Sequence, residues 1–242
     1  MIKNSSVLVV IFFLFLISLR IAYDLLNGIE YHYDEAQYWV WSQNPSLSYL
    51  TKGPFVASII SLSNSIFGQS YLGLKFFSLL AYIGTIIFIS YSSIALNKDK
   101  NIGTTALLIT GLSPAVFFLG GVASTDVYLF FFWSLVLFGY IKFTLNKDVR
   151  WFYFIALATG LGLLTKLSMA LLPISILIYF LFTEYRKYLY SIHLYFSALL
   201  TILITSPIVI WNIDNDWLTL SHEMGHLVSG TPSNNPEILL MT

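Results

Sequence analysis

The chain has 242 residues, of which 57% are hydrophobic and only 10% are charged, and its formal net charge is zero. A soluble domain carries about 25% charged residues, so this composition excludes a soluble globular protein and predicts a polytopic membrane protein. Zero net charge gives no general attraction for nucleic acid, so no nucleic-acid partner is expected. The chain has no cysteine, which excludes disulfides, iron–sulfur clusters and thiolate zinc sites.

Apolar stretches of about the length of a membrane span recur along the chain. We expect spans at residues 5–26, 71–95, 103–122, 125–145, 151–166, 168–184 and 191–212. The first resembles a signal peptide, but no small-residue cleavage site follows it, so it is expected to be retained. The shorter apolar stretch 54–67 is expected to lie at the membrane interface. The predicted fold is an all-α bundle of about seven transmembrane helices, forming one module over residues 1–242.

Basic residues of the short loops predict which side of the membrane each loop occupies. They fall in alternate loops: Lys98 and Lys100, Lys147 and Arg150, and Arg186 and Lys187. By the positive-inside rule these loops and the N-terminus belong in the cytoplasm. The first outer loop (27–70), the turns near 121–126 and Lys166, and everything after about residue 212 then face outward. Most acidic residues lie on that side. Either acid simply avoids the cytoplasmic loops, or a polar site faces outward.

The last residues, "PEILLMT", begin an apolar run and stop inside it. We therefore expect that the C-terminal part of a longer protein is missing from this chain.

The first outer loop, "YHYDEAQYWVWSQNPSLSYLTKGPF" (31–55), holds the most informative polar residues. Asp34 and Gln37 have the spacing of a capping box, which would make Asp34 a helix cap. The aromatic residues Tyr38, Trp39 and Trp41 are typical of anchors at the membrane interface. A cap at Asp34 would explain neither the neighbouring Glu35 nor Lys52.

Two outer lysines and one outer acid each have a structural and a functional interpretation. Lys52 precedes the apolar stretch that starts at Pro54; it either reaches to lipid headgroups or holds a lipid phosphate together with a helix N-terminus. Asp126 lies in a tight turn, where it either caps the next helix or marks a site at the mouth of the bundle. Lys166 could likewise bind headgroups or a substrate phosphate.

Six segments, in chain order, resemble one family. "Tyr33-Asp-Glu-Ala-Gln-Tyr-Trp39" resembles the D-E-A-x-Y-W motif of lipid-phosphate-dependent glycosyltransferases with the GT-C fold, in the group of protein O-mannosyltransferases and lipid A aminoarabinose transferases. "Tyr49-Leu-Thr-Lys-Gly-Pro54" is similar to that group's K-P-P motif, with Gly53 replacing the first proline. Segment 67–75 is similar to its G-x-S-x-x-x-x-R motif, with Lys75 for arginine. The other similar segments are 124–126, 160–166 and 206–212.

The resemblance implies sugar transfer from a polyprenyl-phosphate sugar to a lipid, glycan or protein acceptor, on the outer face of a bacterial inner membrane. It implies that Asp34 is the catalytic base or the carboxylate that positions the acceptor, that Glu35 supports or orients it, and that Asp126 is a second acid in the cavity. A carboxylate can take the proton of an acceptor hydroxyl, and cations can stabilise a phosphate leaving group. One carboxylate opposite a cationic leaving side suits a single inverting displacement.

The same resemblance assigns the substrate-binding residues. Lys52 would hold the lipid phosphate, helped by Arg20 and Lys166, and Tyr38 would contact substrate. His222 would either contact substrate or be a structural residue. Membrane lipids are the remaining expected partners. The acids Asp34, Glu35 and Asp126 could bind a divalent metal, but such ions usually need more oxygen ligands, so metal dependence is left open.

One further motif indicates a different function. "LSHEMGHLVSG" (220–230) contains His222-Glu223-x-x-His226, the spacing of a zinc protease in which two histidines bind the metal and the glutamate is the base. A third ligand is not evident, because Ser229 and Pro232 stand where the extended motif needs glycine and histidine. A membrane zinc metalloprotease is therefore the alternative prediction. A transporter would more typically show repeat symmetry and ionisable residues at mid-membrane.

Overall fold

The computed structural model describes residues 32–219, Ser221 and eight separate positions before residue 27 (11, 14, 15, 17, 18, 21, 22 and 26). Within residues 32–219 every regular element is helical, which confirms the all-α class predicted from composition. Most of the predicted first span lies outside the described residues. So do Arg20 and the whole His222-Glu223-x-x-His226 motif.

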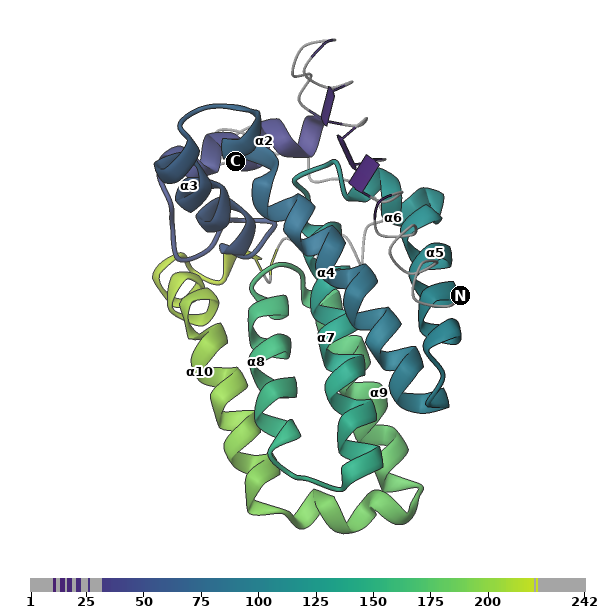
Figure 1. Ribbon diagram of the computed structural model, residues 1–242. Coiled ribbons are helices and arrows are strands. Elements are labelled where there is room, and N and C mark those ends of the chain that lie inside the picture. Colours follow the sequence, from purple (N-terminus) through teal and green to yellow (C-terminus); the bar gives the residue numbers. More distant parts are fainter. Residues whose placement is uncertain are drawn as a thin grey trace.

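Three helices in the described part are long and apolar enough to cross a membrane: α4 (Tyr71–Asn97), α7 (Thr125–Asn146) and α10 (Ile192–Asp214). Each lies within a few residues of an expected span. The shorter apolar helix α8 (Trp151–Leu163) packs against both α7 and α10, and α4 packs against α7 (Figure 1). These helices confirm a polytopic membrane protein.

The segment between α8 and α10 is bent. The short 3-10 helix η1 (Leu167–Ala170) leads into α9 (Leu171–Leu181). A second 3-10 helix, η2 (Glu184–Tyr190), follows, and the chain bends by 112° between the segment 167–181 and η2. If this bent pair counts as one span, residues 32–219 contain up to four spans by length and composition. The expected number for the whole chain was about seven.

The expected continuous span at 103–122 is wrong. The structure has two helices there, α5 (Lys100–Leu112) and α6 (Pro114–Leu119), separated at Ser113. Pro114 has no N–H to continue a helical ladder, and its ring disfavours the helical conformation of the preceding residue. Ser113 accordingly has φ −57° and ψ 123°, outside the helical region.

The helices arrange the loops at two opposite ends of the bundle (Figure 1). One end, which we call the α2 end, carries α2 (Tyr33–Gln43), α3 (Phe55–Phe67) and the turns 120–124 and 164–166. The other end, which we call the basic end, carries the loops 98–99 and 147–150 together with η2. The predicted grouping of the basic loops on one side is therefore confirmed.

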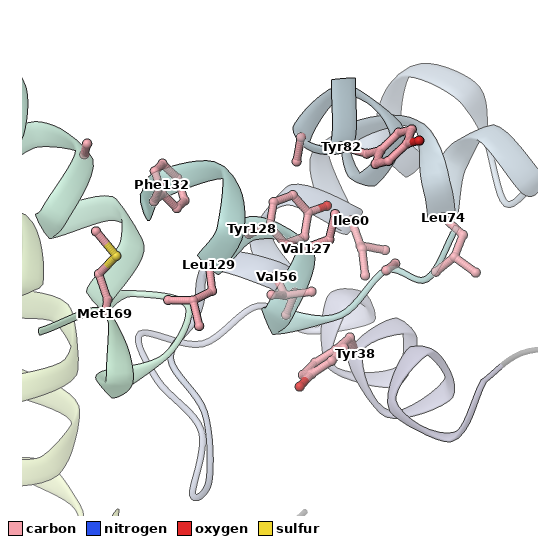
Figure 2. Close-up of a cluster of buried hydrophobic side chains, with 14 of the residues drawn as sticks. Tyr38, Val56, Ile60, Leu74, Tyr82, Val127, Tyr128, Leu129, Phe132 and Met169 are labelled. Atoms are coloured by element: carbon pink, nitrogen blue, oxygen red, sulfur yellow. The ribbon is translucent and has the colours of Figure 1, made fainter. Parts of the chain in front are cut away.

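The core at the α2 end joins α2 and α3 to the long helices. Tyr38, Val56, Ile60, Tyr82 and Tyr128 are all buried in it (Figure 2). α3 buries only one face, formed by Val56, Ala57, Ile60 and Ser63. That pattern suits an amphipathic helix, so its predicted interfacial position stays a prediction. This core fixes the positions of the polar residues described next.

Candidate active site

Asp34 is not the cap of α2, contrary to the capping box predicted from sequence. α2 begins at Tyr33, and the N-cap is His32, whose backbone N–H donates to Glu35 Oε2 at 3.0 Å. Glu35 therefore occupies the third helical position, where the acid of a capping box belongs. Asp34 is partly exposed and makes no hydrogen bond or ion pair with any residue in 32–219. Its predicted role as the catalytic base stays a prediction.

Glu35 is buried and links α2 to neighbouring elements through hydrogen bonds and an ion pair. Its residue is 0% exposed, and its Oε1 accepts a hydrogen bond from the Ala123 backbone N–H at 2.6 Å. Lys75 Nζ lies 3.4 Å from the same oxygen and donates to the Gly121 carbonyl at 2.9 Å. Because both charges are paired and hydrogen-bonded, they avoid the large penalty of an isolated buried ion. The pair ties α2, α4 and the turn before α7 together.

Lys75 was not assigned a role from sequence, although its position departs from the family motif. Lysine keeps the positive charge of the arginine that the motif expects, and Glu35 uses that charge. The available signal was an ionisable side chain near the start of an otherwise apolar span, where such residues are usually functional. Glu35 holds the first turn of α2 against the turn 120–124, and its predicted role in orienting Asp34 stays a prediction.

Tyr38 is a buried tyrosine that feels the charge of both candidate acids, Asp34 and Asp126. It is 2% exposed, and its hydroxyl is hydrogen-bonded to the side chain of Thr125. Burial raises the pKa of Tyr38 to about 12, and the negative charges of Asp34 and Asp126 add to that rise. Both carboxylates therefore lie near this one hydroxyl. Its predicted contact with substrate stays a prediction, but a buried Tyr38 does not act as a membrane anchor.

Trp41 also packs inside the protein instead of facing lipid. Its ring stacks on Tyr49 with centroids 4.2 Å apart, and the Tyr49 hydroxyl donates to the Trp41 carbonyl at 3.2 Å. This contact holds the loop that follows α2 against the helix itself. The interpretation of Trp41 as an interfacial anchor is therefore wrong.

Asp126 and Lys166 form an ion pair between the start of α7 and the turn after α8. Lys166 Nζ lies 2.7 Å from Asp126 Oδ1, and the two side chains are 34% and 39% exposed. Asp126 is in the first turn of α7, after Ser124 as N-cap, so the structure does not make it the cap. Lys166 lies in the turn between α8 and η1. The structure thus joins a predicted acid to a predicted phosphate ligand.

Lys166 and Lys52 line the same pocket. Its volume is about 290 Å³, and its walls come from the loop before α3, the turn after α8 and the end of α10. The lining residues are Ser48, Thr51, Lys52, Gly53, Leu163, Thr165, Lys166, Leu167, Ser168, Ile208 and Thr219. The structure therefore brings together two of the three cations predicted to hold a phosphate; the third, Arg20, is outside the described residues.

Gly53, the other departure from the family motif, allows the segments that carry these two lysines to pack closely. A Cβ atom at Gly53 would lie 2.1 Å from the Leu164 carbonyl oxygen. That same oxygen accepts a hydrogen bond from the Phe55 N–H at 3.1 Å. The loop of Lys52 and the turn of Lys166 thus touch backbone to backbone, a contact that only glycine permits.

The three acids do not form one metal site. Glu35 is occupied by Lys75 and two backbone N–H groups, and Asp126 is paired with Lys166, which leaves Asp34 alone. Among the described residues no group of three His, Cys, Asp or Glu side chains is placed to hold a metal ion. The zinc motif of the alternative prediction, His222-Glu223-x-x-His226, falls outside those residues and stays a prediction.

Known proteins resemble this chain in sequence. It is 25% identical over 81% of its length to lipid A galacturonosyltransferase RgtD of Rhizobium johnstonii, and 25% identical over 87% to lipopolysaccharide core galacturonosyltransferase RgtA of the same organism. An uncharacterized protein of Aquifex aeolicus is 29% identical over 64% of the chain. The alignments cover 41%, 42% and 32% of these relatives, so the chain spans less than half of their length. No solved structure matches it.

A family profile gives the broader assignment. The profile described as dolichyl-phosphate-mannose-protein mannosyltransferase matches residues 51–211, well over half of the chain. The matched range includes Lys52, Lys75, Asp126 and Lys166, four of the charged residues that the structure pairs or places in the pocket. The chain belongs to this family of GT-C-type membrane proteins.

Proposed function

We propose that this chain is part of a membrane glycosyltransferase that moves a sugar from a polyprenyl-phosphate-linked donor to an acceptor on the extracytoplasmic face. The observation that carries the proposal is the pocket that Lys52 and Lys166 share. Lys166 pairs with Asp126 at the start of α7, and Asp126 and Asp34 both act on the charge of Tyr38, so the pocket lies next to the two acids. A phosphate leaving group and an acceptor hydroxyl need those two environments side by side.

The two lysines suit the phosphate. As the bond between the anomeric carbon and the phosphate oxygen breaks, its electron pair stays on that oxygen, and nearby cations stabilise the growing negative charge. The described charges of the pocket region are two lysines and Asp126, a sum of +1. That sum matches the single charge of a phosphodiester donor better than the larger charge of a pyrophosphate.

Asp34 suits the base. It lies in the first turn of α2 and has no hydrogen-bond or ion-pair partner in residues 32–219. In the proposed step the acceptor oxygen bonds to the anomeric carbon while its proton passes to the Asp34 carboxylate. The phosphate leaves without protonation, so no second acid is needed and the displacement inverts the anomeric carbon. Glu35 and Lys75 position Asp34 through the first turn of α2.

The acceptor and the membrane are inferred from the relatives and the topology. The names of the two Rhizobium relatives favour a lipid-linked glycan as acceptor and a uronic acid as sugar. The organisms of the relatives favour a bacterial inner membrane. The grouping of basic loops at the end opposite the site supports placing that end in the cytoplasm. The site would then face the periplasm.

Transfer by the full-length protein tests the proposal. Membranes containing it would be given a radiolabelled polyprenyl-phosphate sugar, and label in the acceptor lipid fraction would be measured. We expect Asp34→Asn to reduce kcat by about 100-fold or more with little change in donor KM, because it removes the base but leaves the pocket. Lys52→Met should raise donor KM instead.

Lys100→Met is the matched control, since this exposed lysine lies at the basic end. It should transfer sugar at the parent rate. If Asp34→Asn is as fast as the parent, Asp34 is not the base, and if Lys52→Met keeps the parent KM, the pocket does not bind the donor.

A further inference from the structure

Two lysine–carboxylate pairs lie at the α2 end, and they differ in how tightly they are held. In the pair of Lys75 and Glu35 the side chains are 7% and 1% exposed, and each ion has further fixed partners in the backbone. In the pair of Lys166 and Asp126 the side chains are 34% and 39% exposed. A partly exposed pair contributes little free energy, so its partners can be exchanged easily.

The exchangeable pair includes a lysine of the phosphate pocket. Lys166 lines the cavity with Lys52, yet its Nζ is turned to Asp126 at 2.7 Å. Lys52 has no ion pair with any residue in 32–219. One pocket lysine therefore has no carboxylate partner among residues 32–219, and the other is paired with a carboxylate of the protein.

We propose that Asp126 competes with the donor phosphate for Lys166 and so sets the affinity of the pocket for phosphate. This inference rests on the proposed function, because it takes the phosphate to bind between Lys52 and Lys166. When the phosphate enters, Lys166 turns from Asp126 to the phosphate oxygens. Asp126 is then freed beside Asp34 and Tyr38 only while the donor is bound.

The competition also acts after transfer. The phosphate group of the polyprenyl phosphate that remains carries more negative charge than the phosphodiester group of the donor, so two free lysines would hold it more tightly. When Lys166 pairs with Asp126 again, of the two lysines only Lys52 remains to neutralise the phosphate. Asp126 thereby favours release of the product phosphate.

Binding of farnesyl phosphate to the purified full-length protein, measured by calorimetry, tests this role. Asp126→Asn removes the competitor, so we expect it to bind the phosphate about two- to fivefold more tightly than the parent, as suits a partly exposed pair. Lys166→Met should bind it more weakly. In the Lys166→Met background, Asp126→Asn should have no further effect, because the lysine for which both anions compete is gone.

Two further variants complete the experiment. Asp148→Asn removes a carboxylate at the basic end and should leave the affinity unchanged, which controls for net charge. Asp126→Ser also removes the charge and keeps a residue suited to a helix start, so it replaces Asp126→Asn if that variant does not fold.

The outcomes separate this inference from the proposed function. Equal or weaker binding by Asp126→Asn overturns the competition while leaving the pocket intact. Tighter binding that persists in the Lys166→Met background also overturns it, because the effect would then be one of charge alone. If the parent does not bind farnesyl phosphate, or Lys52→Met binds it equally well, the proposed donor pocket itself is wrong.

Discussion

The two ends of the bundle carry the same kinds of charged residue and use them in opposite ways. At the α2 end the ion pairs join separate elements: Glu35 on α2 with Lys75 on α4, and Asp126 on α7 with Lys166 in the turn after α8. At the basic end the ion pair is local, between Arg150 and Asp148, with the arginine side chain 84% exposed. Pairing across elements needs a fixed tertiary structure, whereas local pairing needs only the chain.

The basic end is held by aromatic packing instead. Phe143, Phe152 and Phe180 are buried together, and the rings of Tyr185 and Tyr188 pack on Phe143. Aromatic groups of this kind bury large apolar areas. One charge that contacts this cluster, Lys147, donates to the Tyr185 hydroxyl and not to a carboxylate. The comparison teaches that the α2 end buries charged groups in its interior. Burying charges lowers stability relative to apolar packing, so their presence indicates a functional region.

The largest effect should come from breaking the buried pair. Lys75→Met leaves the Glu35 carboxylate buried without its cation, so we expect a loss of about 3 to 5 kcal/mol in the free energy of unfolding. Lys75→Arg keeps the charge and should be much less destabilising. Arg150→Met at the basic end should leave stability almost unchanged, because the arginine is solvent-exposed. Unfolding of the purified variants in detergent measures all three.

Equal stability of Lys75→Met and Arg150→Met would remove the distinction between the two ends. The double variant Glu35→Gln with Lys75→Met should recover part of the loss, because no charge then remains buried.

A smaller effect should follow from separating the two pocket lysines. In Gly53→Ala the new methyl group would meet the Leu164 carbonyl oxygen, which is backbone and cannot turn away as a side chain can. We expect the loop of Lys52 to shift from the turn of Lys166, and transfer to fall by up to about 100-fold. The sugar-transfer assay measures this directly.

Gly84→Ala is the matched control, because its added methyl group would meet only the movable ring of Phe131 within the bundle. If Gly53→Ala transfers sugar as well as Gly84→Ala does, the contact between these two backbone segments does not hold the pocket together.

The smallest effect concerns alkaline pH. The pKa of Tyr38 is raised from 10.0 to about 12, chiefly by burial, so the folded state keeps a proton that the unfolded state loses. This contribution to stability is fully present below about pH 10 and is lost as pH rises toward about 12. Melting temperatures at pH 8 to 12 should fall less steeply for Tyr38→Phe than for the parent, and parallel curves would count against a buried Tyr38 hydroxyl.

Several features could be predicted from sequence because they depend on short stretches. Spans near α4, α7 and α10 follow from apolar length, and the common side of the basic loops follows from Lys and Arg positions. The break at Ser113-Pro114 was also readable from the proline, but hydropathy over residues 103–122 hid it. The pairs His32–Glu35 and Asp34–Gln37 both have the three-residue spacing of a capping box, so spacing alone could not choose between them.

The sequence by itself determined the helical class, the common end of the basic loops and the candidate residues Asp34, Lys52, Asp126 and Lys166. Those properties are local: each span must satisfy its own backbone hydrogen bonds in lipid, and each motif is a run of neighbours. Only the tertiary structure decided that Glu35 is buried against Lys75, that Asp126 holds Lys166, and that Gly53 lets two loops touch. These contacts join residues far apart in the chain, and the packing of the helices, not the sequence spacing, sets the distances between them.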